Sequence, residues 1–170
     1  AAGADCIASA SYQASIPGFV RQGLSEPAAE RLLRRSVELA LEARDEFWAN
    51  RENRKHRQRP LVAASIGPYG AVLADGSEYR GDYDLDAAGL ADFHRRRLGT
   101  LAGCGADLLA CETIPSASEA RALARLVVET PDLPAWFSFS CRDGRHISDG
   151  TPISQCVEEL ESIREIVAVG

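Results

Sequence analysis

The chain has 170 residues, of which 45% are hydrophobic and 26% charged, as in a globular protein with one sizeable core. Its net charge of -6 and its pI near 5.1 argue against a nucleic-acid-binding protein, which needs a basic face. No apolar run approaches the ~20 residues that span a bilayer, and no signal peptide is visible. We therefore expect neither a nucleic acid nor a membrane as partner.

The first half of the chain begins with a short apolar strand over 6–10, followed by the loop SYQASIPGF. Ser25 can then cap a helix that tolerates Pro27 in its first turn. The basic segment 51–59 (RENRKHRQR) is interpreted as a solvated loop between that helix and the next element. An apolar strand over 61–66 follows this loop.

The second half repeats the alternation of helix and strand. Asp84 or Asp86 can cap a second helix, and a strand over 107–111 follows it. Ser116 and Glu119 have capping-box spacing and open a third helix. The third helix runs through Val128, and the later elements are a strand over 135–140, a helix opened by Thr151 and Pro152 that ends near Leu160, and a strand over 166–169.

Five strands alternating with four helices predict a parallel sheet with helices packed outside it. An open doubly wound sheet and part of a (β/α)₈ barrel are both compatible with this order. The open sheet is expected to carry a glycine-rich phosphate turn after its first strand, and SYQASIPG is not one. A complete barrel takes about 250 residues, and this chain is shorter and has no methionine. We predict α/β architecture, a partial (β/α)₈ TIM barrel with about five of eight units, in one domain over 1–170.

Polar side chains gather where three of the predicted strands end. Loop 67–83 is long, acidic and aromatic, and it follows the strand over 61–66. Barrel enzymes build their active sites at the carboxyl ends of their strands. The tyrosines of this loop could hold a cation on their ring faces, or they could simply pack the loop onto the barrel mouth.

Two further strand ends carry candidate binding groups. Glu112 and Thr113 follow an apolar strand, where a carboxylate can bind an ammonium group, act as a base, or pair with an arginine at the rim. Ser11, Tyr12 and Gln13 suit a small polar ligand, or they could be satisfied loop groups.

The five cysteines are scattered and odd in number, which is typical of a reduced, cytoplasmic protein. Cys104 and Cys111 lack zinc-site spacing and are interpreted as buried thiols. The three histidines are dispersed as well, and the single lysine, Lys55, lies in the basic segment. A Schiff-base mechanism needs a lysine inside the barrel mouth, so it is excluded for a lysine of this chain.

Several of these blocks together resemble the homocysteine S-methyltransferase family. The resemblance covers nearly the whole chain, and its most specific block is LVAASIGPYGAVLADGSEYRGDY. The other blocks are ASYQAS, SVELALEARD, DFHRRR, GADLLACETIP, AWFSFSCRDG, DGTPI and VAVG.

The resemblance implies a barrel enzyme that holds zinc through cysteine thiolates and binds homocysteine through its sulfur. The thiolate takes a methyl group from S-methylmethionine or S-adenosylmethionine and becomes methionine. Glu112 matches the acid expected to hold the homocysteine ammonium, with Thr113 beside it. Matches to the early strand-end site are Ser11, Tyr12 and Gln13, and matches to the loop near the donor are Gly67, Tyr69 and Tyr79.

One departure from the family pattern concerns the metal. The family's zinc cysteines belong to segments expected beyond Gly170, and none of the five cysteines here takes a ligand position. We therefore expect an internal fragment, lacking one unit in front and two behind, that neither binds zinc nor turns over substrate by itself.

Two alternatives to a methyltransferase fragment remain. One is a truncated, non-catalytic barrel that binds an amino acid or a protein partner. The other is a different barrel enzyme that uses Cys111 as its nucleophile, although no histidine lies near it in the sequence. The sequence does not distinguish between the two sulfonium donors and carries no signal of oligomeric state.

Overall fold

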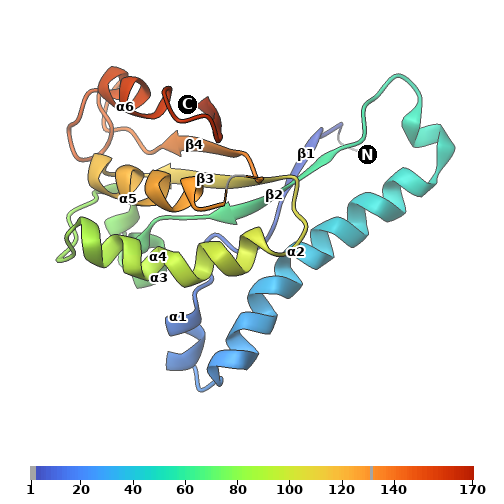
Figure 1. Cartoon of the computed structure of the whole chain (residues 1–170), viewed down its shortest axis with the longest axis horizontal. Coiled ribbons are helices and arrows are strands. Elements are labelled where there is room, and N and C mark those ends of the chain that lie inside the picture. The colour runs from blue at the N-terminus through green and yellow to red at the C-terminus, as the bar shows by residue number, and fades with distance from the viewer. Residues whose placement is uncertain (1–2, 131) are drawn as a thin grey trace.

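The computed structural model describes residues 3–130 and 132–170. Its strands form one sheet in the order β1-β2-β3-β4-β5, and every neighbouring pair is parallel. The strands are β1 (Cys6–Ala8), β2 (Leu61–Ile66), β3 (Leu108–Ile114), β4 (Ala135–Phe139) and β5 (Ile166–Val169) (Figure 1).

Helices connect all successive strands of this sheet. The α-helices are α1 (Ile16–Arg21), α2 (Glu26–Ala49), α3 (Tyr69–Leu73), α4 (Ala87–Ala102), α5 (Ala117–Val128) and α6 (Ile153–Leu160). Two 3₁₀ turns accompany them, η1 (Arg51–Arg54) and η2 (Ser77–Tyr79). Helix α2 is the longest, with 24 residues, and it carries the basic segment away from the sheet (Figure 1).

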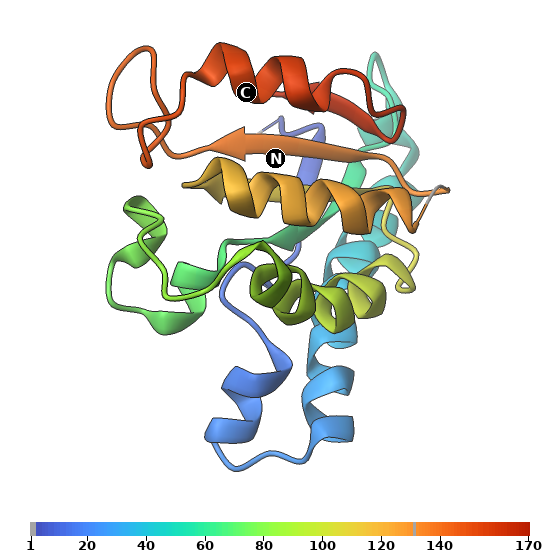
Figure 2. The same cartoon turned by 60° about the vertical axis from the view of Figure 1, so that its left-hand side comes forward.

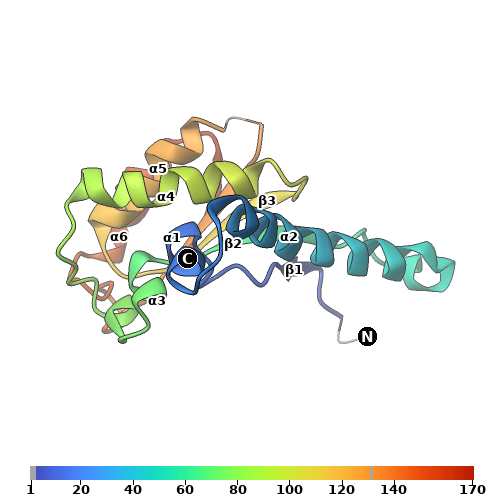
Figure 3. The ribbon, with the colours of Figure 1, turned by 90° about the horizontal axis from the view of Figure 1, so that it is seen from below.

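The long helices pack on one face of the sheet, as in the wall of a barrel. Alternate strand residues such as Val62, Leu109 and Phe137 join one large cluster with side chains from α2, α4, α5 and α6. Helices α2 and α4 lie side by side against this face (Figure 3). A doubly wound sheet would reverse its strand order and place helices on both faces. The sequential order and the single helical layer therefore fit the predicted partial (β/α)₈ barrel.

The other face of the sheet carries a smaller apolar cluster. Ala63, Leu108 and Ala110 are buried there, and Cys6 and Trp136 pack against them. These residues alternate along β2 and β3 with those that face the helices, as the two-residue period of a strand requires. The same alternation directs Ser65 and Glu112 to the side away from the helices.

Several element boundaries differ from the prediction. Strand β1 ends at Ala8, two residues earlier than predicted, and β3 extends to Ile114. Helix α1 lies where a loop was predicted, because Ser15 caps it by accepting a hydrogen bond from the N–H of Gly18. Helix α3 and the turn η2 likewise lie inside the predicted loop 67–83.

The predicted helix caps had mixed outcomes. Asp86 caps α4 and Ser116 caps α5, each through its side-chain oxygen. Ser25 lies at the predicted cap of α2 but makes no side-chain capping bond. Thr151 was predicted to cap α6, but the cap is Pro152, one residue later. In the part of the chain that the structure describes, no helix combines the length and apolarity needed to cross a membrane.

Candidate functional site

The carboxyl ends of β1, β2 and β3 bring together the polar residues that the sequence singled out. The long segments after β2 and β4 gather at the same end of the sheet (Figure 2). Glu112 is half-buried and accepts a very short hydrogen bond from the hydroxyl of Ser65, on the neighbouring strand. Within the described residues Glu112 makes no ion pair. Pairing with an arginine at the rim, the structural alternative for this acid, is therefore not observed.

Thr113 has a strained backbone next to this carboxylate. Its φ angle is +63°, in the left-handed region that a β-branched residue rarely adopts. The pairing of β3 with β4 is irregular between Cys111 and Ile114, where Thr113 lies. Its N–H points to the hydroxyl of Ser138, with a nitrogen-to-oxygen distance of 3.4 Å. Backbone strain of this kind is concentrated at functional sites.

Serine hydroxyl groups link the segment after β1 to β2. The Ser11 hydroxyl donates to the carbonyl of Ser65 at 2.7 Å and lies 2.7 Å from the hydroxyl of Ser9. Ser9 in turn accepts the backbone N–H of Ser65 at 3.0 Å. Ser11 is fully buried, so its hydroxyl connects the segment after β1 with the end of β2 inside the protein. Gln13, also predicted to bind, is exposed.

Tyr12 packs directly on Gly67, which explains the glycine. A Cβ atom at position 67 would lie 2.6 Å from the carbonyl oxygen of Tyr12 and 2.7 Å from its ring. Burial raises the pKa of the Tyr12 phenol, and a hydrogen bond with Thr113 opposes that rise. Tyr12, Gly67 and Thr113 thus meet although they come from three different strand ends.

The tyrosines of loop 67–83 have different environments. The Tyr69 ring packs edge-on against Tyr83 and Phe93, with centroid distances of 5.3 and 4.9 Å. Burial strongly raises the pKa of Tyr83. Tyr79 is 63% exposed, and its ring is available at the rim of the site.

Three further residues under this loop were not predicted from the sequence to belong to the site. His94 and Arg97 in α4 and Glu119 in α5 are almost completely buried. A signal existed for α4, since positions 94 and 97 share a helical face with the apolar residues Leu90 and Leu101, which are buried. The capping-box prediction was half right, because Ser116 accepts from the N–H of Glu119 but the Glu119 side chain contacts Tyr69 and His94 instead.

The cysteines do not supply a metal centre or a nucleophile. Cys111 lies in the core with the residues that face the helices, and burial raises its pKa to about 12. Burial likewise raises the pKa of Cys156 to about 11. Among the residues that the structure describes, no three His, Cys, Asp or Glu side chains lie close enough together to hold a metal ion. The described residues therefore offer no set of ligands that would fit zinc, and the surroundings of Cys111 do not support the alternative that uses it as a nucleophile.

Comparison with known proteins shows the family of the chain. A model of the homocysteine S-methyltransferase family matches residues 1–170. The chain belongs to this family. It is 56% identical over 170 residues to the homocysteine S-methyltransferase YbgG of Bacillus subtilis (strain 168). The match covers 100% of this chain and 54% of that protein. A relative from Zea mays, homocysteine S-methyltransferase 1, is 51% identical over 174 residues, with 99% of this chain and 54% of the relative covered. The family predicted from the sequence is confirmed.

Solved structures of the family share the fold. The metallated form of the homocysteine methyltransferase MmuM from Escherichia coli superposes with a TM-score of 0.92 at 50% identity. The match covers 99% of this chain and 57% of that one, so the chain spans about half the length of its relatives. MmuM is a TIM-barrel enzyme, and the predicted partial barrel is thereby confirmed.

Proposed function

We propose that the complete protein containing this chain is a homocysteine S-methyltransferase, which takes a methyl group from a sulfonium donor and forms methionine. The donor is S-methylmethionine or S-adenosylmethionine. The homocysteine sulfur, having lost its proton, attacks the methyl carbon, and the carbon–sulfur bond of the sulfonium breaks with its electron pair moving to the departing sulfur. Family membership supports the reaction. We propose that this chain contributes part of the substrate site.

The observation that carries this proposal is the state of Glu112. Its carboxylate lies near the carboxyl end of β3, accepts a hydrogen bond from the Ser65 hydroxyl, and has no cationic partner among the described residues. A half-buried carboxylate without a counter-ion is suited to an incoming ammonium group. We therefore assign Glu112 to the homocysteine ammonium, with Tyr12 and Thr113 beside the substrate.

The donor is proposed to lie against loop 67–83. A sulfonium is a cation, and an aromatic ring face attracts cations within about 6 Å of its centroid. Tyr79 has an exposed ring for this contact, whereas Tyr69 is engaged with Tyr83 and Phe93. Gly67 contributes by allowing Tyr12 to approach the loop closely.

We propose that the metal of the complete protein is zinc and that its cysteine ligands lie beyond Gly170. The metallated form of MmuM supports a metal in the family. A cytoplasmic location is proposed from the five cysteines, all of which are free thiols. Metal analysis of the complete protein, and of the 170-residue chain, tests the assignment of ligands. Tight stoichiometric zinc in the shorter chain would overturn it.

The decisive assay measures methyl transfer from each sulfonium donor to homocysteine by the complete, zinc-loaded protein. Glu112→Gln removes the charge but keeps the shape, so the homocysteine KM should rise about 30-fold through loss of a charge-assisted hydrogen bond of about 2 kcal/mol. Glu129→Gln, an exposed acid at the end of α5, is the matched control. An inactive complete protein rejects the function, and an unchanged KM rejects the role of Glu112.

A further inference from the structure

A buried polar cluster lies beneath loop 67–83. Glu119 and His94 both have side chains that are 0% exposed, although they come from different helices. One Glu119 oxygen, Oε1, accepts the backbone N–H of Tyr69 at 2.6 Å and lies 2.8 Å from Nε2 of His94. Tyr69 is the first residue of α3, and the preceding Pro68 makes no side-chain capping bond. Glu119 therefore supplies the acceptor that the start of α3 lacks.

Arg97 lies on the same face of α4 as His94 and contacts the loops after β1 and β2. It follows His94 by three positions and is buried to 1% exposure. Its guanidinium donates to the carbonyl oxygens of Gly67, Ser11 and Tyr12 at 3.0, 2.9 and 2.6 Å. One side chain thus fixes both the loop after β1 and the beginning of the loop after β2.

The loop is compact enough for its anchor to set its position as a whole. A Cβ at Gly70 would lie 2.3 Å from the backbone nitrogen of Glu78, so the two arms of the loop touch. The Ser140 hydroxyl also points to the carbonyl of Glu78, with an oxygen-to-oxygen distance of 3.4 Å. A shift at the start of α3 is therefore transmitted to η2, which carries Tyr79.

The charges of this cluster are not arranged for maximal stability. Burial lowers the pKa of Arg97 to about 10, so that it remains charged at neutral pH. Oε2 of Glu119, Nδ1 of His94 and the Tyr83 hydroxyl are buried without a partner among the described residues. A buried network that is only partly satisfied is a poor source of stability. Its value therefore lies in the geometry that it imposes.

We propose that Glu119, His94 and Arg97 are positioning residues, which clamp the loops after β1 and β2 so that the proposed acceptor and donor sites keep a fixed separation. The inference rests on the proposed function for its kinetic consequence only. The clamp itself is a statement about loop 67–83 and can be tested without turnover.

The test compares Glu119→Gln, Glu119→Ala and Glu129→Gln in the complete protein. Glu129 is the matched control because it also connects α4 with α5, through Arg95 at 2.5 Å, but on the exposed surface. Gln at 119 keeps the shape and one acceptor oxygen, and it remains informative if the Ala variant fails to fold. Amide hydrogen exchange over 67–83 and the kinetics of both substrates are measured.

We expect Glu119→Gln to speed exchange over 67–83 by about tenfold, with a larger effect of Ala and none in the control. The donor KM should rise about fivefold while kcat changes less than about twofold, as for a positioning residue. Exchange equal to that of the control overturns the clamp, and faster exchange with an unchanged KM overturns its role in positioning. If the unaltered protein shows no methyl transfer, the proposed function fails, and the exchange comparison alone decides the clamp.

Discussion

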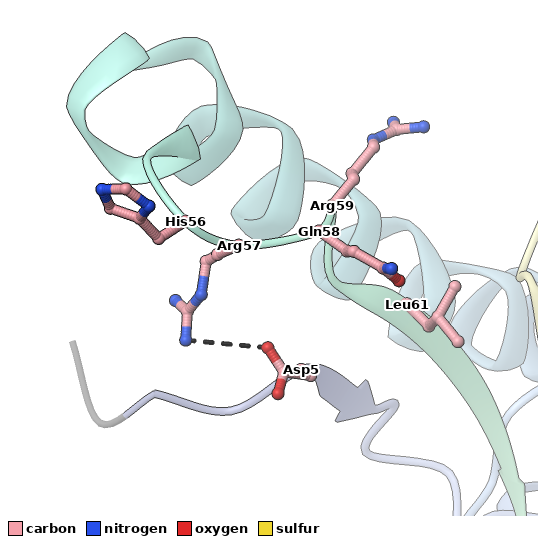
Figure 4. A pocket seen from close by; sticks show the side chains of 6 residues that line it. All are labelled: Asp5, His56, Arg57, Gln58, Arg59 and Leu61. Atoms are coloured by element: carbon pink, nitrogen blue, oxygen red, sulfur yellow. Dashed lines mark ion pairs between the residues drawn. The ribbon is translucent and has the colours of Figure 1, made fainter.

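The basic segment 51–59 and the cluster under loop 67–83 use charged residues in opposite ways. In the basic segment, Arg57 pairs with Asp5 at 3.7 Å, and both residues line a pocket of about 470 Å³ (Figure 4). Arg59 pairs with Asp45 at 2.6 Å. Asp5 is 81% exposed there, whereas His94 and Glu119 in the cluster are 0% exposed.

The exposed charges of the basic segment are solvated by water, whereas the buried charges of the cluster are proposed to position the loops above them. Exposed pairs are screened by water and contribute little to stability. Buried charged groups lose their hydration, and they are tolerated only where hydrogen bonds hold them in a defined geometry. Sequence alone ranks the basic segment as the more conspicuous of the two, but the structure places the consequential charges under loop 67–83.

The largest expected effect comes from Arg97. Arg97→Met removes the donor that the structure shows for the carbonyl oxygens of Gly67 and Tyr12, and one of the two donors of the Ser11 carbonyl, which also accepts the N–H of Ala14. It also removes a fully buried guanidinium, so the free energy of unfolding of the complete protein should fall by about 4 kcal/mol. Arg96→Met is the control, because the neighbouring Arg96 makes exposed pairs with Glu26 and Glu30. Urea unfolding measures both variants. Equal losses in the two variants would contradict the expectation that the buried arginine contributes more to stability than its exposed neighbour.

The second-largest expected effect is the contribution of His94 to the pH dependence of stability. Burial lowers the pKa of His94, with Arg97 acting in the same direction and Glu119 opposing it. The unfolded chain therefore binds the proton first, and stability falls as pH drops below about 6.5, by at most about 1.4 kcal/mol per pH unit for one proton. His94→Gln should flatten this part of the unfolding profile. A profile identical to that of the unaltered protein would contradict a buried, neutral His94.

A substitution at Thr113 should have a smaller effect, and it should increase stability instead of lowering it. Glycine adopts a φ of +63° without strain, so Thr113→Gly should raise the free energy of unfolding by about 0.5–1 kcal/mol. Thr113→Ala keeps the strain and should give no such gain. Thermal unfolding of the two variants side by side tests this. A gain in Ala equal to that in Gly would locate the effect in the side chain instead.

The smallest effect belongs to the basic segment. Arg59→Ala removes an exposed partner of Asp45 and should leave the thermal midpoint unchanged within the error of the measurement. Repeating the comparison at high salt provides the control, since screening weakens an exposed pair further. A clear loss of stability would mean that exposed charges of the basic segment also stabilise the fold, which would contradict the difference between the two regions.

Much of the fold follows from local patterns in the sequence. The continuous apolar run over 61–66 and the helical spacing after Ser25 predict a strand and a helix, and both are present. The acid at position 112 also stands out against the apolar strand that carries it. The short helix α1 was missed because six residues present too little periodicity to distinguish a helix from a loop.

Within the candidate site, the sequence by itself determined which residue types stand at the strand ends, because strand and helix periods are properties of neighbouring residues. Only the tertiary structure decided which charged groups meet. His94 and Glu119 are 25 positions apart, and they come into contact only because α4 and α5 pack together. The strained φ of Thr113 has the same origin, since the irregular pairing of β3 with β4 imposes it. Burial and long-range packing, which no local period encodes, set the chemistry of these groups.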